Sequence, residues 1–325
     1  MPTASTAGKA APSTSPSQNV SNQVVAAESG NELFFAVVGH VGSGTSMVAQ
    51  LLTEELGEAG YQVDILKARN VIVEAAAAAG DTLPPAPPTP ALSYAQQLQD
   101  AGDQMRQQSG DHAAVARALI GKIRAKRAER QGSTPGPGPV VPDGTKRAYI
   151  LDSIRHPAEV RLLRQVYHTA FTLIGVVCDE HVREERLHAK YSDGGQENAR
   201  KFMRRDERAS EKYGQRVGDA FHLSDAFLDN TAPRLVPGGG ANPIFDLGDQ
   251  LSRLVGIVSH VRVLRPTIAE TGMYAASGAQ QRSACLSRQV GAALLDRSGN
   301  LLATGTNEVP RAGGGVYGQD FAGES

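Results

Sequence analysis

The chain has 325 residues, with 33 basic and 34 acidic side chains, a formal net charge of -1 and 40% apolar residues. This composition excludes a fibrous or mainly disordered chain, and the balanced charge excludes a global field that would attract nucleic acid or an anionic membrane. Two cysteines, Cys178 and Cys285, cannot form a disulfide framework. No apolar stretch approaches the ~18 residues of a membrane-spanning helix, and the N-terminus carries neither a secretory nor a transit signal. We expect a cytoplasmic protein of about two domains, in which any anion site is local.

The first part of the chain predicts a leader followed by a strand-helix-strand unit. Residues 1–30 are rich in Ser, Thr, Ala and Pro, which predicts a disordered leader. The apolar run LFFAVVG at 33–39 is typical of a central strand buried on both faces of a parallel sheet. Residues 46–59 place apolar side chains at helical spacing, and 61–66 predict the next strand. These elements together predict a βαβ unit.

Two proline-rich segments, 82–90 and 132–142, interrupt the α/β pattern, because proline removes backbone donors. They bracket a predicted helical insertion at about 82–142, with helical composition over 94–131 and a break near 109–111. The insertion ends in a basic run, which predicts either a solvated helix face or a contact with phosphate or nucleic acid.

The α/β pattern then resumes and continues to residue 261. Strand patterns alternate with helical ones, and a further segment is helix-like and rich in arginine. The predicted strands cover 147–151, 170–178 and 226–230, and the predicted helices cover 153–167, 180–190, 197–213 and 244–261. This alternation predicts a doubly wound parallel-sheet α/β domain over about 31–261, and 262–325 remain for a second, smaller domain.

A glycine-rich loop lies between the first predicted strand and helix. Its sequence GHVGSGTS has the spacing GxxxxG-x-S, which favours an anion nest of backbone N–H groups at a helix N-terminus. The candidate phosphate-binding residues are Gly39, Gly42, Ser43, Gly44, Thr45 and Ser46. Thr45 stands where a P-loop has its lysine, so the motif is a degenerate Walker A and a tight structural turn is the alternative. Ser46 keeps a hydroxyl for magnesium.

Further candidates lie outside the loop. Asp152 ends an apolar strand and could hold a metal or water opposite the loop, or cap the next helix. Arg204 and Arg205 are suited to clamping phosphate, or form a solvated face. The arrangement resembles nucleoside and nucleotide kinases of the P-loop class over most of 33–260. The resemblance implies nucleotide binding, with magnesium as a possible cofactor, and the absent lysine favours binding over turnover.

Residues 271–315 predict a helix followed by a β-hairpin. The segment has R-S-x-C-x-x-R-x-V-G-A and then G-x-N-x-x-P, formed by Arg282, Ser283, Cys285, Arg288, Val290, Gly291, Ala292, Gly305, Asn307 and Pro310. This pattern closely resembles the opening elements of the deoxycytidylate deaminase family. With the P-loop-like domain before it, the layout resembles bacterial two-domain deoxycytidine nucleotide deaminases associated with defence against phage.

The resemblance implies that 262–325 begin an α/β/α cytidine-deaminase-like domain and that the substrate is dCMP or dCTP, whose cytosine amine is hydrolysed. The complete protein would be a homo-oligomer. Asn307 would bind the sugar, and Arg288 and Ser283 would face the phosphates. The alternatives are a loop-capping Asn, an exposed Arg and a helix-region Ser. Cys285 is interpreted as a small buried side chain, with a zinc ligand as the alternative.

The family uses a zinc-activated water held by an H-x-E…P-C-x-x-C arrangement, which this sequence lacks. Zinc is therefore expected only for a complete family member. No catalytic or metal-ligating residue is assigned in this chain, and it is predicted to be an inactive fragment on its own. Two other functions stay open: a nucleotide kinase with a regulatory C-terminal extension, and a nucleotide-binding regulatory module that pairs with another chain carrying the zinc site.

Overall fold

The computed structural model describes residues 31–307, except Thr82, Pro135, Pro137, Ser192, Gly194 and Arg262. The predicted leader at 1–30 and Pro310 of the deaminase-like pattern lie outside the described residues. The chain divides into two compact units, with the boundary between Arg262 and Val263. Each unit is described separately below.

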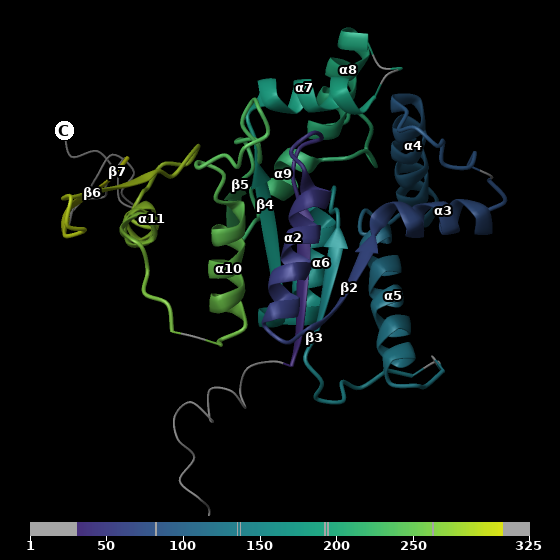
Figure 1. The fold of residues 1–325 in the computed structure, drawn as a ribbon, viewed down its shortest axis with the longest axis horizontal. Coiled ribbons are helices and arrows are strands. Elements are labelled where there is room, and N and C mark those ends of the chain that lie inside the picture. The colour runs from purple at the N-terminus through teal and green to yellow at the C-terminus, as the bar shows by residue number, and fades with distance from the viewer. Residues whose placement is uncertain are drawn as a thin grey trace, which may run out of the picture. The chain divides into compact units, whose positions relative to one another are not determined.

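Five parallel strands form the sheet of the larger unit, in the order β2-β3-β1-β4-β5 (Figure 1). Every residue of β1 is buried, and β1 pairs with β3 on one side and with β4 on the other, which confirms the predicted central strand. The strands are β1 (Glu32–Val38), β2 (Gln62–Lys67), β3 (Arg147–Asp152), β4 (Phe171–Val177) and β5 (Ala226–Asp229). The register places Val37 beside Asp152, so the ends of β1 and β3 lie together.

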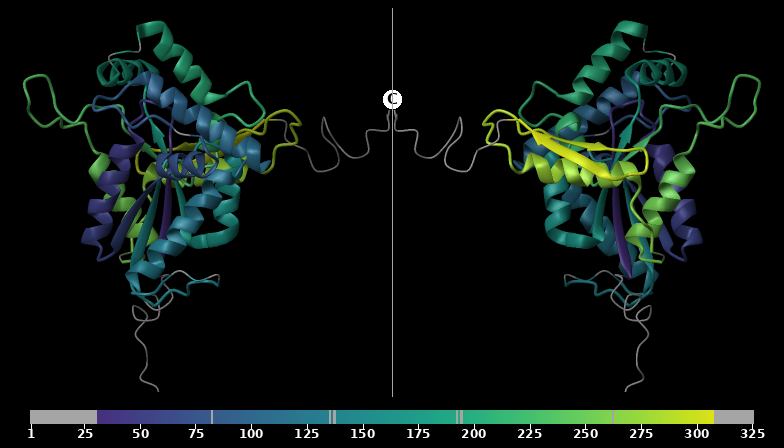
Figure 2. Two further views of the ribbon diagram at one scale, coloured as in Figure 1. Left: turned by 90° about the vertical axis from the view of Figure 1, so that its right-hand side faces the viewer. Right: turned by 90° about the vertical axis from the view of Figure 1, so that its left-hand side faces the viewer.

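Helices cover both faces of this sheet, which confirms the predicted α/β class. Leu33, Phe35 and Val37 of β1 pack with α2 (Thr45–Glu58) and α10 (Leu247–Val258). Phe34, Ala36 and Val38 point to the opposite face, because side chains alternate along a strand. That face is covered by α5 (Ala114–Arg130), α6 (Pro157–Tyr167) and α9 (Val217–Phe221) (Figures 1 and 2).

Two connections carry additional helices beyond the carboxyl ends of the strands (Figure 1). Between β2 and β3 the chain forms α3 (Ala68–Ala78), α4 (Leu92–Ser109) and α5, and Gly110, with φ 64°, makes the predicted break between α4 and α5. Between β4 and β5 it forms α7 (Glu180–Lys190) and α8 (Gly195–Glu207). These two insertions supply the walls of the candidate site.

The predicted helix at 153–167 begins four residues later, at Pro157. His156 is its N-cap: Nδ1 of His156 accepts a hydrogen bond from the N–H of Ala158, and the Glu159 carboxylate accepts one from the N–H of His156. Pro157, at the first helical position, has no N–H and therefore needs no hydrogen-bond acceptor there. The residues between Asp152 and His156 therefore form a loop at the carboxyl edge of the sheet.

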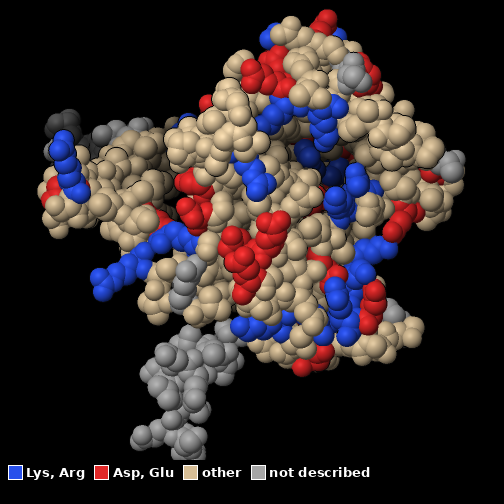
Figure 3. Space-filling view, viewed as in Figure 1, with Lys and Arg blue, Asp and Glu red and all other residues tan. Residues whose placement is uncertain are grey.

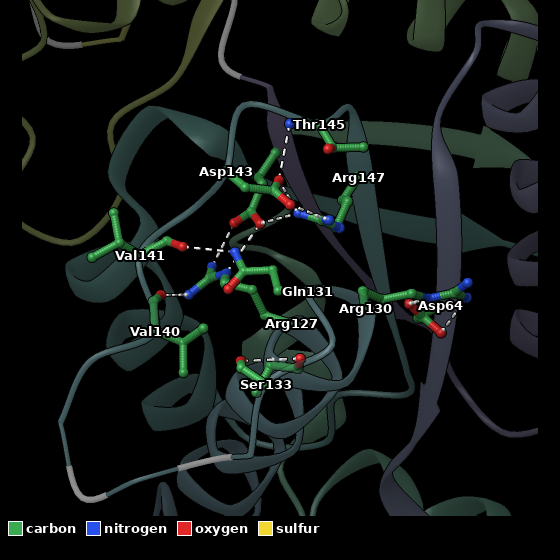
Figure 4. Close-up of polar contacts among 12 residues, drawn as sticks. Asp64, Arg127, Arg130, Gln131, Ser133, Val140, Val141, Asp143, Thr145 and Arg147 are labelled. Carbon is green, nitrogen blue, oxygen red and sulfur yellow. Dashed lines mark hydrogen bonds and ion pairs between the residues drawn. The ribbon is translucent and has the colours of Figure 1, made fainter.

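The basic run at the end of α5 contacts acidic side chains of the sheet. Arg127 donates to both carboxylate oxygens of Glu32, and its side chain is only 13% exposed. Arg130 pairs with Asp64, and the neighbouring Arg147 pairs with Asp143 (Figure 4). Because Glu32 begins β1, this cluster lies at the end of the strand opposite to the glycine loop. The run therefore stabilises the base of the sheet.

The smaller unit consists of one helix and a hairpin. In it, α11 (Ile268–Gln280) packs against β6 (Gly291–Leu295) and β7 (Leu301–Thr306), which are antiparallel. A β-carbon on Gly291 would lie 1.9 Å from the carbonyl oxygen of Ala276, so only glycine allows this close approach of strand and helix. Among the described residues, no helix has the length and apolar character needed to cross a membrane.

Candidate phosphate-binding site

The glycine loop connects β1 to α2 at the carboxyl edge of the sheet. Gly42 and Gly44 have φ angles of 87° and 86°, in the left-handed region that favours glycine. A β-carbon on Gly42 would lie 2.7 Å from the carbonyl oxygen of Arg183, and one on Gly44 would lie 2.4 Å from Nδ2 of Asn230. Both glycines are therefore required by backbone conformation and by packing. Gly44 is also the N-cap of α2, so free N–H groups of the first helical turn begin here.

Side chains from distant elements fix the loop. Oδ2 of Asp206 accepts a hydrogen bond of 2.8 Å from the N–H of Val41. Asp206 is fully buried and also pairs with Arg155. Nδ2 of Asn230, directly after β5, donates to the carbonyl oxygen of Ser43 at 2.7 Å. The loop is thus held by Asp206 of α8, between β4 and β5, and by Asn230 after β5.

Ser46 and Asp152 lie together at the ends of β1 and β3. The Ser46 hydroxyl donates to Oδ2 of Asp152 at 2.8 Å, and Asp152 is buried. A hydroxyl and a carboxylate beside a phosphate nest fit magnesium, which binds few protein oxygens and keeps water and phosphate oxygens as its other ligands. Zinc finds no comparable site, because no three His, Cys, Asp or Glu side chains of the described residues are grouped to hold a metal.

A cavity of about 410 Å³ opens beside the loop. Gly42, Gly44, Thr45 and Ser46 contribute one wall, and the others come from the start of α3, from α4, from the end of β3 and from α7 and α8. Asp152 is the one carboxylate among the described lining residues, whereas the lining has five cationic side chains: Lys67, Arg69, Arg155, Arg186 and Lys190. Figure 3 shows lysine and arginine side chains around a hollow in this part of the surface.

Most of these cations lack an acidic partner. Within the described part of the chain, only Arg155 of the five forms an ion pair, with Asp206. His40 also lines the cavity. Its pKa is lowered, mainly by burial of the imidazole and next by the nearby Arg183, so the neutral form is favoured. Uncompensated positive charge beside oriented N–H groups favours an anionic ligand with several oxygens.

The wall farther from the loop combines apolar and amide side chains. Ile72, Leu98 and Phe202 line it, together with Gln99 and Gln215. Both glutamines are buried, and Nε2 of Gln99 donates to Oε1 of Gln215 at 3.3 Å. Oε1 of Gln99 has no hydrogen-bond partner within the described chain. The mixture of apolar and amide side chains in this wall suits a small organic ligand with apolar and polar groups.

The predicted site residues fall into two groups. Gly42, Gly44, Thr45, Ser46 and Asp152 line the cavity. Gly39 and Ser43 support the loop without lining it: Ser43 is 1% exposed, and a β-carbon on Gly39 would lie 3.1 Å from the carbonyl oxygen of Val176.

The structure does not bring Arg204 and Arg205 to the cavity. Arg205 instead pairs with Asp100 and Asp103 of α4. The buried face of α8 is formed by Phe202, Met203 and Asp206 among others, so the intervening arginines point elsewhere. The five cations that do line the cavity were not among the predicted site residues. The spacing of Arg183, Arg186 and Lys190 on one face of α7 was the available signal.

In the smaller unit, Ser283 and Asn307 are in contact. Oγ of Ser283 donates to Oδ1 of Asn307 at 2.8 Å, and the same oxygen accepts from the N–H of Val290. Nδ2 of Asn307 donates to the carbonyl oxygen of Arg288 at 2.7 Å. The Asn307 amide therefore joins the end of β7 to the segment before β6. Cys285 is half-buried, and its backbone N–H donates to the Ser283 hydroxyl.

No family model and no curated protein matches the sequence. Among solved structures, a putative kinase from Chloroflexus aurantiacus is 11% identical, with a TM-score of 0.36 over 70% of this chain and 97% of that one. A gluconokinase from Sinorhizobium meliloti is 13% identical, with a TM-score of 0.35 over 70% and 94%. A shikimate kinase from Acinetobacter baumannii, in complex with shikimate, is 9% identical, with a TM-score of 0.33 over 71% and 96%. The strand order and the glycine loop themselves establish an α/β domain of P-loop-like architecture.

Proposed function

We propose that the larger unit binds a nucleoside triphosphate through the glycine loop and acts as a kinase-like domain on a small second ligand. The single observation that carries this proposal is that the glycine loop at the start of α2 borders a cavity in which four of the five lining cations form no ion pair with a described residue. Loop N–H groups would hold phosphate oxygens, and the cations would balance their charge.

Ser46 and Asp152 would hold magnesium in this proposal. Bound magnesium would neutralise part of the charge on the β- and γ-phosphates. Asp152 would orient the ion while it accepts the Ser46 hydroxyl proton in a hydrogen bond. The second ligand would occupy the wall formed by Ile72, Leu98 and Gln99. Lys67 and Arg69, at the start of this wall, favour a second ligand that carries a carboxylate or phosphate.

Calorimetric titration with ATP and magnesium tests the proposal. We expect saturable binding that Gly44→Ala weakens, because the new methyl group would meet Asn230 at a φ angle unsuited to alanine. Gly121→Ala is the matched control, since no atom lies within 4 Å of a β-carbon there. Equal affinities of the parent and Gly44→Ala, with both proteins folded, would leave the loop as a structural turn.

For the smaller unit we propose a role in a deoxycytidine nucleotide pocket, on the resemblance to the deaminase family. The exposed side chain of Arg288 supports this, because it is open to a ligand, whereas the Asn307 amide forms hydrogen bonds with Ser283, Val290 and Arg288 and so fits the loop-capping alternative. The proposal includes no hydrolytic step, since the described residues provide no zinc ligand set. Titration with dCMP should show binding that Arg288→Gln weakens. An unchanged titration curve for this variant would remove Arg288 from the pocket.

A further inference from the structure

The glycine loop carries no cationic side chain of its own. Thr45 stands at the position after Gly44, where the Walker A spacing places lysine. Backbone N–H groups supply only partial charges, whereas a triphosphate with one magnesium ion keeps a net negative charge. If the loop binds a triphosphate as proposed above, a full positive charge must come from another element.

Four of the five lining cations are poorly placed for this task. Arg155 is engaged with Asp206. Lys67 ends β2, which is separated from β1 and the loop by β3, and the register places it beside Asp152. Nζ of Lys190 lies over the Tyr191 ring, 5.1 Å from its centroid, and Arg69 is exposed at the start of α3.

Arg186 differs from these residues in its position. Its Nη1 would lie 3.8 Å from a β-carbon on Gly44, so the guanidinium group reaches the N-cap residue of α2. The same nitrogen donates to Sγ of Cys178 at 3.4 Å, which fixes the side chain without neutralising it. No carboxylate in the described part of the chain pairs with Arg186, and the residue lines the cavity.

The helix that carries Arg186 also rests on the loop. The closest atom to a β-carbon on Gly42 would be the carbonyl oxygen of Arg183, one turn earlier on α7. Because α7 begins three residues after β4, its first turns follow the sheet closely. The position of the guanidinium group is thus set by the packing of α7 against the glycines.

We propose that Arg186 takes the place of the missing P-loop lysine and binds the terminal phosphates of a nucleoside triphosphate held in the loop. An arginine provides a permanent charge and two parallel N–H donors for phosphate oxygens. This inference rests on the proposed function of the larger unit. Because the positive charge of Arg186 comes from α7, the affinity for phosphate would depend on the contact of α7 with the loop.

A rescue experiment tests the inference with ATP and magnesium as the probe. Arg186→Gln should weaken binding about tenfold or more, in keeping with the loss of a charge-assisted hydrogen bond. Arg117→Gln is the matched control, because it removes the same charge from a residue that pairs with Asp111 outside the cavity. Adding Thr45→Lys to Arg186→Gln should recover most of the lost affinity, because the lysine then stands at its usual position. Thr45→Lys in the parent should gain much less.

Each outcome has a distinct meaning. If the parent does not bind ATP, both the proposed function and this inference are overturned. If the parent binds and Arg186→Gln binds within twofold of it, only the inference fails. If Arg186→Gln is weak and Thr45→Lys does not restore binding, Arg186 shapes the loop without supplying its charge, and the inference is again overturned. Thermal unfolding of each variant distinguishes lost binding from lost folding.

Discussion

Arg106 and Glu159 form an ion pair in the interior of the larger unit. Nη2 of Arg106 lies 3.0 Å from Oε1 of Glu159, and the two side chains are 2% and 1% exposed. The other carboxylate oxygen of Glu159 accepts the N–H groups of Arg155 and His156. This pair joins α4 of the insertion to the start of α6, next to the loop that follows Asp152.

Removing the charge of Glu159 should be costly. Glu159→Gln removes one of the two carboxylates that pair with the buried Arg106 guanidinium, and only Asp103 remains. We therefore expect the free energy of unfolding to fall by about 3 kcal/mol, measured by urea denaturation. Glu197→Gln, whose partner Lys201 is exposed, should leave the midpoint unchanged. Similar midpoints for the two variants would contradict a structural role for the buried pair.

The stability should also depend on pH through His156. Burial, followed by the nearby Arg106, lowers the pKa of His156 to about 4, from an ordinary value near 6.5. Between these values the unfolded chain binds a proton that the folded chain does not bind. Stability is therefore complete above about pH 6.5 and decreases as the pH falls toward 4.

The variant His156→Asn checks this assignment, because asparagine keeps an acceptor at the N-cap and cannot titrate. Urea midpoints measured from pH 7 to pH 4 should fall less steeply in this variant than in the parent. His181→Asn changes an exposed imidazole and should keep the slope of the parent. An equal slope in the parent and in His156→Asn would assign the pH dependence to other groups.

The magnesium contact predicts a metal-dependent loss of affinity. Asp152→Asn keeps an oxygen acceptor for the Ser46 hydroxyl but removes the charge that would orient the ion. We expect binding of ATP with magnesium to weaken about tenfold. Binding of ATP in excess chelator should not weaken, because the variant removes a negative charge near the phosphates. An equal loss with and without magnesium would indicate a disturbed loop instead.

The smaller unit offers a test of packing at two glycines. Gly291→Ala would bring a methyl group against the carbonyl oxygen of Ala276 and should separate β6 from α11. Gly305 in β7 has open space around its β-carbon position, so Gly305→Ala should be tolerated. Hydrogen exchange of Leu294 and its neighbours should accelerate only in the first variant. Unchanged exchange in Gly291→Ala would mean that the helix and hairpin do not depend on this contact.

The elements that the sequence predicted correctly are those that are fully buried or whose ends are marked by characteristic residues. The run in β1 is apolar at nearly every position because both faces of the strand are covered, and the helix predicted at 180–190 coincides with α7. The helix α3 was missed, because its alanine-rich second half has little contrast between faces. The cations of the cavity were not predicted either, because the spacing of Arg183, Arg186 and Lys190 does not say which face of α7 contacts the loop. Which side of a helix meets the loop depends on packing, as the outward position of Arg205 and the inward position of Arg186 illustrate.

Two walls of the cavity are encoded by separate stretches of sequence, 68–146 and 178–225, and no described residue of either stretch belongs to a strand of the sheet. The glycine loop lies between them on β1, whose pairing with β3 and β4 involves neither stretch. Both stretches also support the sheet and the loop, because α5 and α9 cover one face of the sheet and Asp206 of α8 accepts the N–H of Val41. Side chains that only line the cavity, such as Leu98 and Lys190, lie outside these contacts. The choice of the second ligand and the supply of charge to the phosphates can therefore diverge at such positions while the core and the loop keep their sequence.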